Sequence, residues 1–329
     1  MRRLPPALIG PSLAWILGAC SGAEGSESSD VVGDTETDTD TEIGTDTETD
    51  TGIETGTDTE TDTETDTETE TGTEGNPLLS DHVLNIAHRG GGRLRPEATL
   101  PAFENALAVG AEIIEMDLHM SSDGVIVVMH DDTVDRTTEG TGAIADMSFD
   151  ELRALDAAYD FTTDGGETFP YRGMGIQIPR VEEIFETFPD AYYLMEIKQA
   201  EPSIVPTFAA LLEDHGVADR IVVASFHDAT IQAFRAASPD TFTAMTLVEM
   251  ATFQQAANDQ DPDYLPPCGF VQSPWELTTK GLIDFAHAHD LMVHPWTVND
   301  AANMETLIAE GVDGIMTDDP LLLEGVLEG

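Results

Sequence analysis

Basic residues are scarce in this chain of 329 residues, which carries 13 lysines and arginines against 64 aspartates and glutamates and a formal net charge of −51. Proteins that bind a phosphate backbone need a basic surface that displaces the counterions of the nucleic acid. The composition therefore excludes nucleic acid as a partner. A field of this sign also repels small anions, so an anionic substrate would need positive charge supplied at its own site.

Cysteines and long apolar runs are also nearly absent. Arg2 and Arg3 precede an apolar run at 8–19, which is too short to span a bilayer stably and has the form of a secretory signal. The run ends in LGAC at Cys20, which resembles a bacterial lipobox, in which the thiol is acylated and the signal removed. We expect a lipoprotein signal peptide over 1–20 and an exported protein anchored by lipid in the cell envelope, at the outer membrane or cell surface. Cys268 is the other cysteine, so no intrachain disulfide is expected in the mature protein.

Residues 21–80 lack lysine, arginine and aromatic side chains and repeat Thr-Asp-Thr-Glu, with 20 acidic residues. Such a segment has little to bury, and its like charges repel one another. It is predicted to be a disordered tether, whose threonines could carry glycans, in front of a folded domain over 81–329. Ordinary signal cleavage and an uncleaved anchor remain alternatives to the lipobox.

Charged side chains follow short apolar runs at several points of the folded part. An apolar run that ends abruptly in charge indicates a buried strand that delivers side chains to the edge of a sheet. Such positions are held by His88, Arg89, Glu115, Asp117 and His130. Because three of these strand ends lie close together in the sequence, they predict a single site.

The spacing of the charges indicates their chemistry. Residues two apart in a strand point the same way, so Glu115 and Asp117 present two carboxylates together, and Glu196 and Lys198 repeat the pattern. Three carboxylates suit a hard divalent cation, Ca²⁺ or Mg²⁺, and would repel one another without it. Arg89 and Lys198 could hold an anion such as phosphate beside the cation. Histidines next to that anion can act as general base and general acid near neutral pH.

Four stretches resemble the glycerophosphodiester phosphodiesterase family. They read IAHRGGGRLRPEATLPAF at 86–103, EMDLHMSSDGVIVVMHDDTVDRTTEGTG at 115–142, MEIK at 195–198 and PWTVND at 295–300. The resemblance spans roughly residues 83 to 320 and agrees in order, spacing and flanking residues. It implies metal-dependent hydrolysis of glycerophosphodiesters to sn-glycerol 3-phosphate and an alcohol.

The resemblance also implies a role for each matching residue. These roles are the catalytic pair His88 and His130, the metal ligands Glu115, Asp117 and Glu196, the phosphate contacts Arg89 and Lys198, and Trp296 near the substrate. We expect His88 as base and His130 as acid. The sequence departs from the family at Ala98, where asparagine is common, and at His227, where aspartate is common.

Alternating apolar runs and helical stretches predict one closed (β/α)₈ barrel, with its site at the carboxyl ends of the strands. Nine strand candidates are one too many, so 242–247 or 269–272 is suspected of being misread. Positions 118 and 125 are only seven apart, too close for a helix between them, which predicts an irregular crossover. The glycine-rich stretch 131–180 is interpreted as an insertion over the rim, with a disordered surface loop as the alternative.

Several residues and functions stay open at this stage. Glu97 is either a site residue or an acid that favours the start of a helix. The acids expected to be turn or cap residues are Asp131, Asp132, Asp318 and Asp319. The histidines outside the catalytic pair are expected to be structural. Two functions rival the diesterase, namely a phospholipase C-like or D-like enzyme acting on phospholipid head groups and a surface-anchored binding protein without catalysis. The oligomeric state is not predicted.

Overall fold

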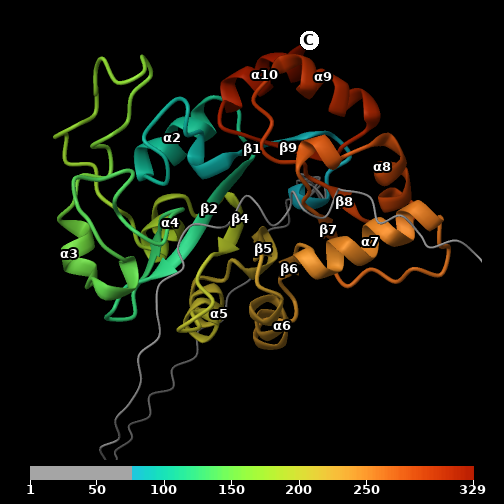
Figure 1. The fold of residues 1–329 in the computed structure, drawn as a ribbon, viewed down its shortest axis with the longest axis horizontal. Coiled ribbons are helices and arrows are strands. Elements are labelled where there is room, and N and C mark those ends of the chain that lie inside the picture. The colour runs from blue at the N-terminus through green and yellow to red at the C-terminus, as the bar shows by residue number, and fades with distance from the viewer. Residues whose placement is uncertain (1–75) are drawn as a thin grey trace, which may run out of the picture. The chain divides into compact units, whose positions relative to one another are not determined.

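The computed structural model describes residues 76–329, in which eight parallel strands form a barrel with helices around its outside (Figure 1). The barrel strands are β1 (Leu84–Ala87), β2 (Ile113–Met120), β4 (Tyr192–Ile197), β5 (Ile221–Ala224), β6 (Phe242–Thr243), β7 (Phe270–Val271), β8 (Met292–Val293) and β9 (Gly314–Thr317). Six of them run in the order β6-β5-β4-β2-β1-β9, and β7 pairs with β8. The predicted (β/α)₈ class is confirmed.

Backbone contacts at short strands close the barrel. Ala244 bridges Phe270 in parallel, which joins β6 to β7. The backbone N–H of Asp313 donates to the carbonyl of Val293 at 3.0 Å, which joins β8 to β9. Both suspected runs, 242–247 and 269–272, therefore supply barrel strands, and the suspicion that one of them was misread is wrong.

The extra strand is β3 (Ile126–Val128), which pairs with β2 in antiparallel register. A parallel crossover needs a dozen or more residues, whereas a short hairpin fits the spacing between 118 and 125. The predicted irregular crossover is therefore a hairpin. Leu118 lies opposite Val128, and the N–H of Met129 donates to the carbonyl of Asp117 at 3.0 Å. The hairpin turns the chain back so that His130 returns to the rim beside the β2 carboxylates.

The surrounding helices pack apolar side chains on the outer face of the sheet. They are α2 (Leu100–Ala108), α4 (Val181–Thr187), α5 (Val205–His215), α6 (Asp228–Ala237), α7 (Leu247–Asp259), α8 (Lys280–His287), α9 (Ala301–Glu310) and α10 (Pro320–Glu328). Thr99, Thr246 and Asp300 accept backbone N–H groups at the starts of α2, α7 and α9, which satisfies donors that a helix leaves free. Phe103 and Phe208 pack in the same buried cluster as the strand residues of β2 and β4.

The interior of the barrel is filled by side chains that alternate along the strands, among them Leu84, Ile113 and Phe270. Leu78 from the 3₁₀ turn η1 (Pro77–Leu79) is fully buried in the same cluster. The ordered part therefore begins before the expected boundary at 80/81, because Leu78 contributes to this core. The predicted signal, Cys20 and most of the tether lie outside the described residues.

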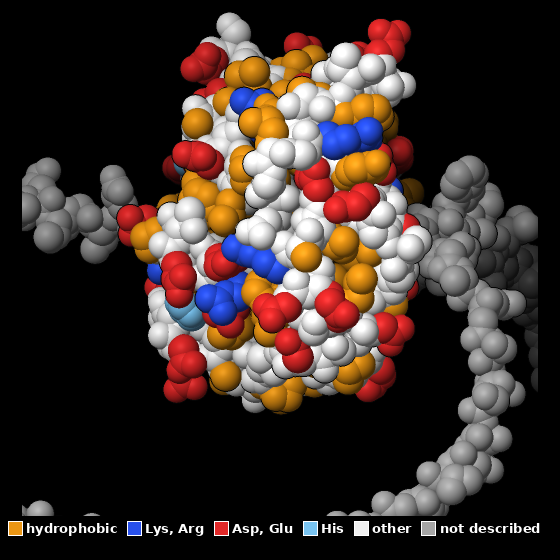
Figure 2. All heavy atoms as spheres, turned by 90° about the vertical axis from the view of Figure 1, so that its left-hand side faces the viewer, with side chains coloured by type: hydrophobic (Ala, Val, Ile, Leu, Met, Phe, Trp, Pro, Cys, Tyr) orange, Lys and Arg blue, Asp and Glu red, His pale blue; other side chains and the backbone are white. Residues whose placement is uncertain are grey.

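The insertion at 131–180 has its own buried cluster. Val134, Ile144, Leu152 and Ile178 pack against Val127 of β3, and the short helix α3 (Phe149–Arg153) begins with a capping box at Ser148. The insertion is thus folded onto the β2–β3 hairpin, which contradicts the alternative of a disordered loop. Figure 2 shows the side of the molecule on which α3 lies, with acidic, basic and hydrophobic side chains interspersed. Over residues 76–329, no helix has both the length and the apolar character needed to cross a bilayer.

Candidate active site

His88 follows β1 directly and is held by the acid that follows β9. Its Nδ1 lies 2.5 Å from Oδ1 of Asp318, and its Nε2 lies 4.0 Å from Oε2 of Glu115. The second oxygen of Asp318 accepts the side-chain amide of Asn299 at 2.6 Å. Burial alone would raise the pKa of Asp318, but the hydrogen bonds from His88 and Asn299 lower it. Asp318 lies in the bend after β9, as expected of a turn residue, and in addition it holds His88, whereas Asp319 caps α10.

His130 has an equivalent partner in the next residue. Its Nδ1 lies 2.6 Å from Oδ1 of Asp131, whose other oxygen accepts Nε of Arg136 at 2.7 Å. Its Nε2 lies 3.3 Å from Nζ of Lys198. Burial, together with the positive charges of Arg89 and Lys198, lowers the pKa of His130 to about 4. Asp131 is therefore a histidine partner and not only a turn residue, as had been expected.

Arg89 links the strand end to the insertion through Glu97. Its backbone adopts a left-handed conformation with a φ of 51°, and its N–H donates to Oε2 of Glu115 at 2.7 Å. Its Nη1 donates to Oε1 of Glu97 at 3.1 Å, and Arg136 donates to both oxygens of Glu97 at 2.6 and 2.9 Å. Burial alone would raise the pKa of Glu97, but these two arginines lower it. Glu97 is thus a site residue, which decides the question that the sequence left open.

The positive φ of Arg89 is followed by two glycines that the turn requires. Gly90 has a φ of 78°, and a Cβ at this position would lie 2.7 Å from the ring of Phe103. Gly90 therefore allows the strand end to pack closely on α2 while Arg89 turns toward the carboxylates. A non-glycine residue in this backbone region stores about 1–3 kcal/mol of strain, which is typical of functional sites.

Glu115, Asp117 and Glu196 lie together at the rim, the first two buried and Glu196 partly buried. Burial raises the pKa of Asp117 well above its usual value, and the charges of the other two carboxylates add to this. Burial also raises the pKa of Glu115 to about 7. Nζ of Lys198 lies 3.3 Å from Glu196 and 3.7 Å from Asp117. Among the described residues, Oδ2 of Asp117 and Oε1 of Glu196 find no hydrogen-bond partner.

Trp296 joins the same rim through an aromatic contact. It follows β8, and its ring meets Phe226 edge to face with centroids 6.0 Å apart. Nζ of Lys198 lies 5.6 Å from the centre of the Phe226 ring. His119 is buried and its Nε2 lies 3.3 Å from the backbone oxygen of His130, so it supports this loop. The structure thus brings all the predicted site residues from 88 to 296 to one rim.

Residues 88–322 match the family model described as the glycerophosphoryl diester phosphodiesterase family. The chain belongs to this family. It is therefore an enzyme of the hydrolase class, as the sequence predicted. A glycerophosphodiester phosphodiesterase of Bacillus subtilis (strain 168) is 30% identical over 267 residues, which cover 78% of this chain and 90% of the relative.

Solved structures agree with the family assignment. A glycerophosphodiester phosphodiesterase from Agrobacterium tumefaciens (strain C58) is 27% identical with a TM-score of 0.61, covering 74% of this chain and 99% of that one. A phosphodiesterase of Oleispira antarctica, solved with the product sn-glycerol-3-phosphate, has a TM-score of 0.63 and covers 74% of this chain and 96% of that one. Its sequence is 23% identical, so this likeness shows the fold.

Enzymes of this family generally use a divalent metal, and the three carboxylates fit one by their chemistry. Two of them keep buried oxygens without hydrogen bonds, which an ion would satisfy. Within residues 76–329, no three His, Cys, Asp or Glu side chains are already gathered as a metal site. Lys198 and Arg89 lie among the acids instead, with Nε of Arg89 3.7 Å from Asp117.

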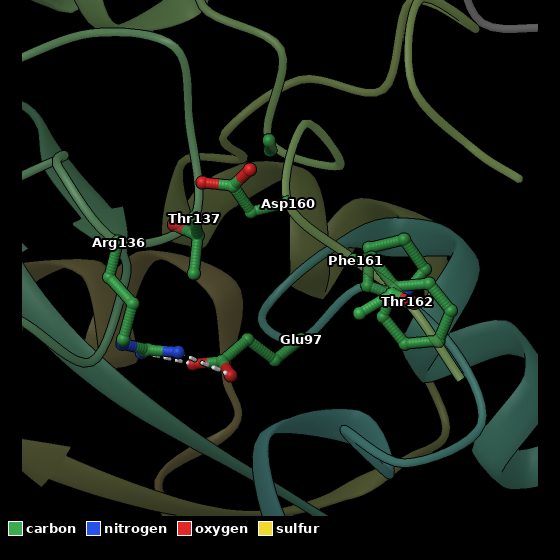
Figure 3. Close-up of a pocket in the computed structure, with 8 residues that line it drawn as sticks. Glu97, Arg136, Thr137, Asp160, Phe161 and Thr162 are labelled. Atoms are coloured by element: carbon green, nitrogen blue, oxygen red, sulfur yellow. Dashed lines mark hydrogen bonds and ion pairs between the residues drawn. The ribbon is translucent and has the colours of Figure 1, made fainter. Parts of the chain in front are cut away.

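A pocket of about 220 Å³ lies beside the rim, between the loop after β1 and the insertion (Figure 3). Glu97 and Arg136 form one wall and face each other in hydrogen-bonding contact. Neither His88 nor His130 lines this pocket. Hydrogen bonds nevertheless link its wall to the site, because Glu97 also binds Arg89 and Arg136 also binds Asp131, the partner of His130.

Proposed function

We propose that this enzyme hydrolyses glycerophosphodiesters to sn-glycerol 3-phosphate and an alcohol through two histidines, with the help of a divalent cation. The observation that carries the proposal is the paired arrangement of His88 and His130. Each imidazole is held at Nδ1 by its own carboxylate, and each Nε2 is directed toward the same cluster of carboxylates and Lys198. The product in the complex of the Oleispira antarctica phosphodiesterase supports the same chemistry.

The reaction begins when Nε2 of His88 takes the proton of the glycerol hydroxyl beside the phosphate. The hydroxyl oxygen attacks phosphorus, and the bond from phosphorus to the leaving alcohol breaks as His130 protonates that oxygen. Water then opens the cyclic phosphate with the two roles exchanged. The free His130 is neutral because burial, together with the charges of Arg89 and Lys198, lowers its pKa. An anionic diester between these cations would offset their charge and let His130 take up the proton it delivers.

The direction of transfer is supported by the pocket. One wall of the pocket is joined to His130 through Arg136 and Asp131. A leaving alcohol protonated by His130 would therefore have space to occupy. We propose that Arg89 and Lys198 contact the phosphate and that Trp296 packs near the glycerol part, since it lies on the same rim.

The cation would be held by Glu115, Asp117 and Glu196, and either Ca²⁺ or Mg²⁺ suits three oxygen ligands. When bound, it would supply positive charge to the phosphoryl oxygens as negative charge develops on them. It would also remove the repulsion that raises the pKa of Asp117. Binding alone does not require two histidines that are each held by a carboxylate, whereas acid–base catalysis does. The two pairs therefore disfavour a binding protein without catalysis.

We also propose that the chain is exported and attached to the cell envelope by a lipid on Cys20. Support comes from the sequence alone, namely the short apolar run and the LGAC motif that ends at Cys20. Replacing Cys20 by serine is expected to release the protein from the membrane fraction and to abolish incorporation of radiolabelled palmitate. Palmitate incorporation into the Cys20→Ser protein would contradict the lipobox assignment.

The catalytic proposal is tested by replacing each histidine in the full chain. His88→Ala and His130→Ala are each expected to reduce turnover of a glycerophosphodiester by about 10²–10⁴-fold without a change in fold. His287→Ala is the matched control, because His287 also pairs with an acid, Asp313 at 2.9 Å, but lies away from the rim. Near-normal turnover in either rim variant would remove that histidine from the catalytic pair.

A further inference from the structure

The pocket beside His130 is lined by groups that both donate and accept hydrogen bonds. Glu97 comes from the loop after β1, whereas Arg136, Thr137, Asp160 and Phe161 come from the insertion. Figure 3 shows Asp160 and Thr137 near each other, across the cavity from the Glu97–Arg136 pair, with the ring of Phe161 at one end. Thr137 lines the cavity, and its hydroxyl makes no hydrogen bond within the described residues, whereas the hydroxyl of the next residue, Thr138, donates to the carbonyl of Val134.

We propose that this pocket binds the leaving alcohol of the diester and selects a small polyhydroxylated alcohol, such as glycerol, a hexitol or a cyclitol. This inference rests on the proposed function and names the substrate class for it. Glu97 and Arg136 form the wall between the pocket and the proposed reacting centre. On the side of that centre, Glu97 binds Arg89 and Arg136 binds Asp131. An alcohol that leaves phosphorus beside His130 would therefore meet this wall, and the cavity beyond it offers the space that a small alcohol needs.

The charges in the pocket favour a polyol over a cationic alcohol. Glu97 is neutralised by two arginines, Arg89 and Arg136. Asp160 is paired with Arg172 at 3.3 Å, and the Arg172 guanidinium is packed between the rings of Tyr159 and Phe169 at 4.0 and 3.7 Å. No carboxylate is left over for a quaternary ammonium group, which would lose its water without gaining a counter-ion. Hydroxyl groups instead can bond to the paired carboxylates and guanidinium groups together.

The size of the pocket excludes a lipid. At about 220 Å³ it is smaller than the roughly 300–1,000 Å³ of sites for drug-sized ligands. The only aromatic ring in its lining is Phe161, and polar side chains make up most of the remaining wall. A leaving alcohol that carried acyl chains would need a longer apolar groove, so this pocket fits a small alcohol and not a diacylglycerol.

The test compares kcat/KM of the full chain for glycerophosphoglycerol and glycerophosphoinositol with kcat/KM for glycerophosphocholine. The polyol diesters are expected to be preferred by about tenfold, the equivalent of one or two additional hydrogen bonds. Thr137→Val should reduce this ratio about two- to tenfold, because it removes a hydroxyl and keeps the shape. Thr137→Ser should restore the ratio. Thr306→Val on α9, where the hydroxyl bonds its own helix, is the matched control.

The outcomes separate the inference from the function on which it rests. Equal use of all three diesters, or a preference for the choline ester, would overturn the polyol pocket while leaving the diesterase intact. A polyol preference that Thr137→Val does not change, in a protein with unaltered melting temperature, would place the selection elsewhere and also overturn it. Failure to cleave any of the diesters would overturn both, since the pocket is defined by the reaction.

Discussion

The Nδ1 atom of His88 and the Oδ1 atom of Asp318 lie 2.5 Å apart, although 230 positions separate them in the sequence. The barrel brings them together because β1 and β9 are neighbours in parallel register, with Ala87 opposite Thr317. Each residue is the first after its strand, so both side chains lie at the same rim of the barrel. Asp318 leaves His88 with one free ring nitrogen, which is the one that can exchange a proton with substrate.

Asp318→Asn should reduce kcat by about 10²–10⁴-fold with a small change in KM. The oxygen of the new amide would accept from the amide of Asn299, which bonds Asp318 at 2.6 Å in the native enzyme. Its NH₂ group would then donate to Nδ1 of His88, so the proton of the neutral imidazole would lie on Nε2. With that proton in place, Nε2 could not accept one from the substrate. Steady-state kinetics on a glycerophosphodiester measure this effect.

Asp313→Asn is the control for that substitution, since Asp313 bonds His287 outside the rim. It should leave kcat close to that of the native enzyme. Equal rates for Asp318→Asn and the native enzyme would show that His88 does not need its carboxylate.

Arg136→Lys should lower kcat by about tenfold or more, because one lysine cannot replace a guanidinium that binds two acids at once. Arg136 donates to both oxygens of Glu97 and to Asp131, and so positions Arg89 and His130 through them. The matched control is Arg153→Lys, which alters a single ion pair with Glu183 in the same insertion. If the two variants had the same kcat, Arg136 would have only a structural role.

The sequence predicted the proposed catalytic and metal-binding residues better than the residues that hold the two histidines in place. His88, Glu115 and Glu196 could be predicted because each ends an apolar run, and runs of this kind are local. Asp318 has the same signal after β9, but an acid before a helix start is equally typical of a cap, and only the β1–β9 pairing decides between these roles. The partner of His130 could not be chosen either, because adjacency in sequence does not show where two side chains point.

The strands of the barrel were also hard to predict from the sequence alone. The three apolar residues of Ile126–Val128 form the same sequence pattern in a parallel and in an antiparallel strand. The direction of pairing depends on the partner strand, which the pattern does not show. The strands β6 and β7 are two residues long, so their pattern carries little periodicity. Loop length carries the useful signal, because the six residues between 118 and 125 are too few for a parallel crossover and fit a hairpin.

Chelation of divalent metal should abolish activity and lower the melting temperature. The carboxylates of Glu115, Asp117 and Glu196 repel one another when bare, and an ion that binds only the folded state stabilises it. An ion at about 100 times its Kd would add about 2.7 kcal/mol. Isothermal titration of the metal-stripped protein with Ca²⁺ and with Mg²⁺ should show one saturable site.

Glu196→Gln should weaken both metal affinity and activity, and excess metal should partly restore the activity. Glu305→Gln, at an exposed position of α9, is the control and should change neither. Full activity in chelator together with no saturable site would contradict the metal proposal.

His294→Leu should make the enzyme more resistant to mild acid. His294 lies inside the barrel, fully buried against Phe270, and neither ring nitrogen has a hydrogen-bond partner among the described residues. Burial lowers its pKa to about 4, below the value of about 6.5 of an unfolded histidine. The unfolded chain therefore takes up a proton between these two pH values that the folded protein cannot accept.

This difference in proton uptake sets the direction in which the unfolding free energy changes with pH. As pH falls from about 6.5 toward 4, this histidine alone should cost the native protein about 1.4 kcal/mol of stability per pH unit, and the cost should level off below the folded pKa. Leucine has no such titration and a similar volume, so His294→Leu should flatten the fall of unfolding free energy in this window. Urea unfolding at pH 7, 6 and 5 measures it. Parallel curves for the native protein and His294→Leu would show that His294 is protonated as easily in the folded barrel as in the unfolded chain.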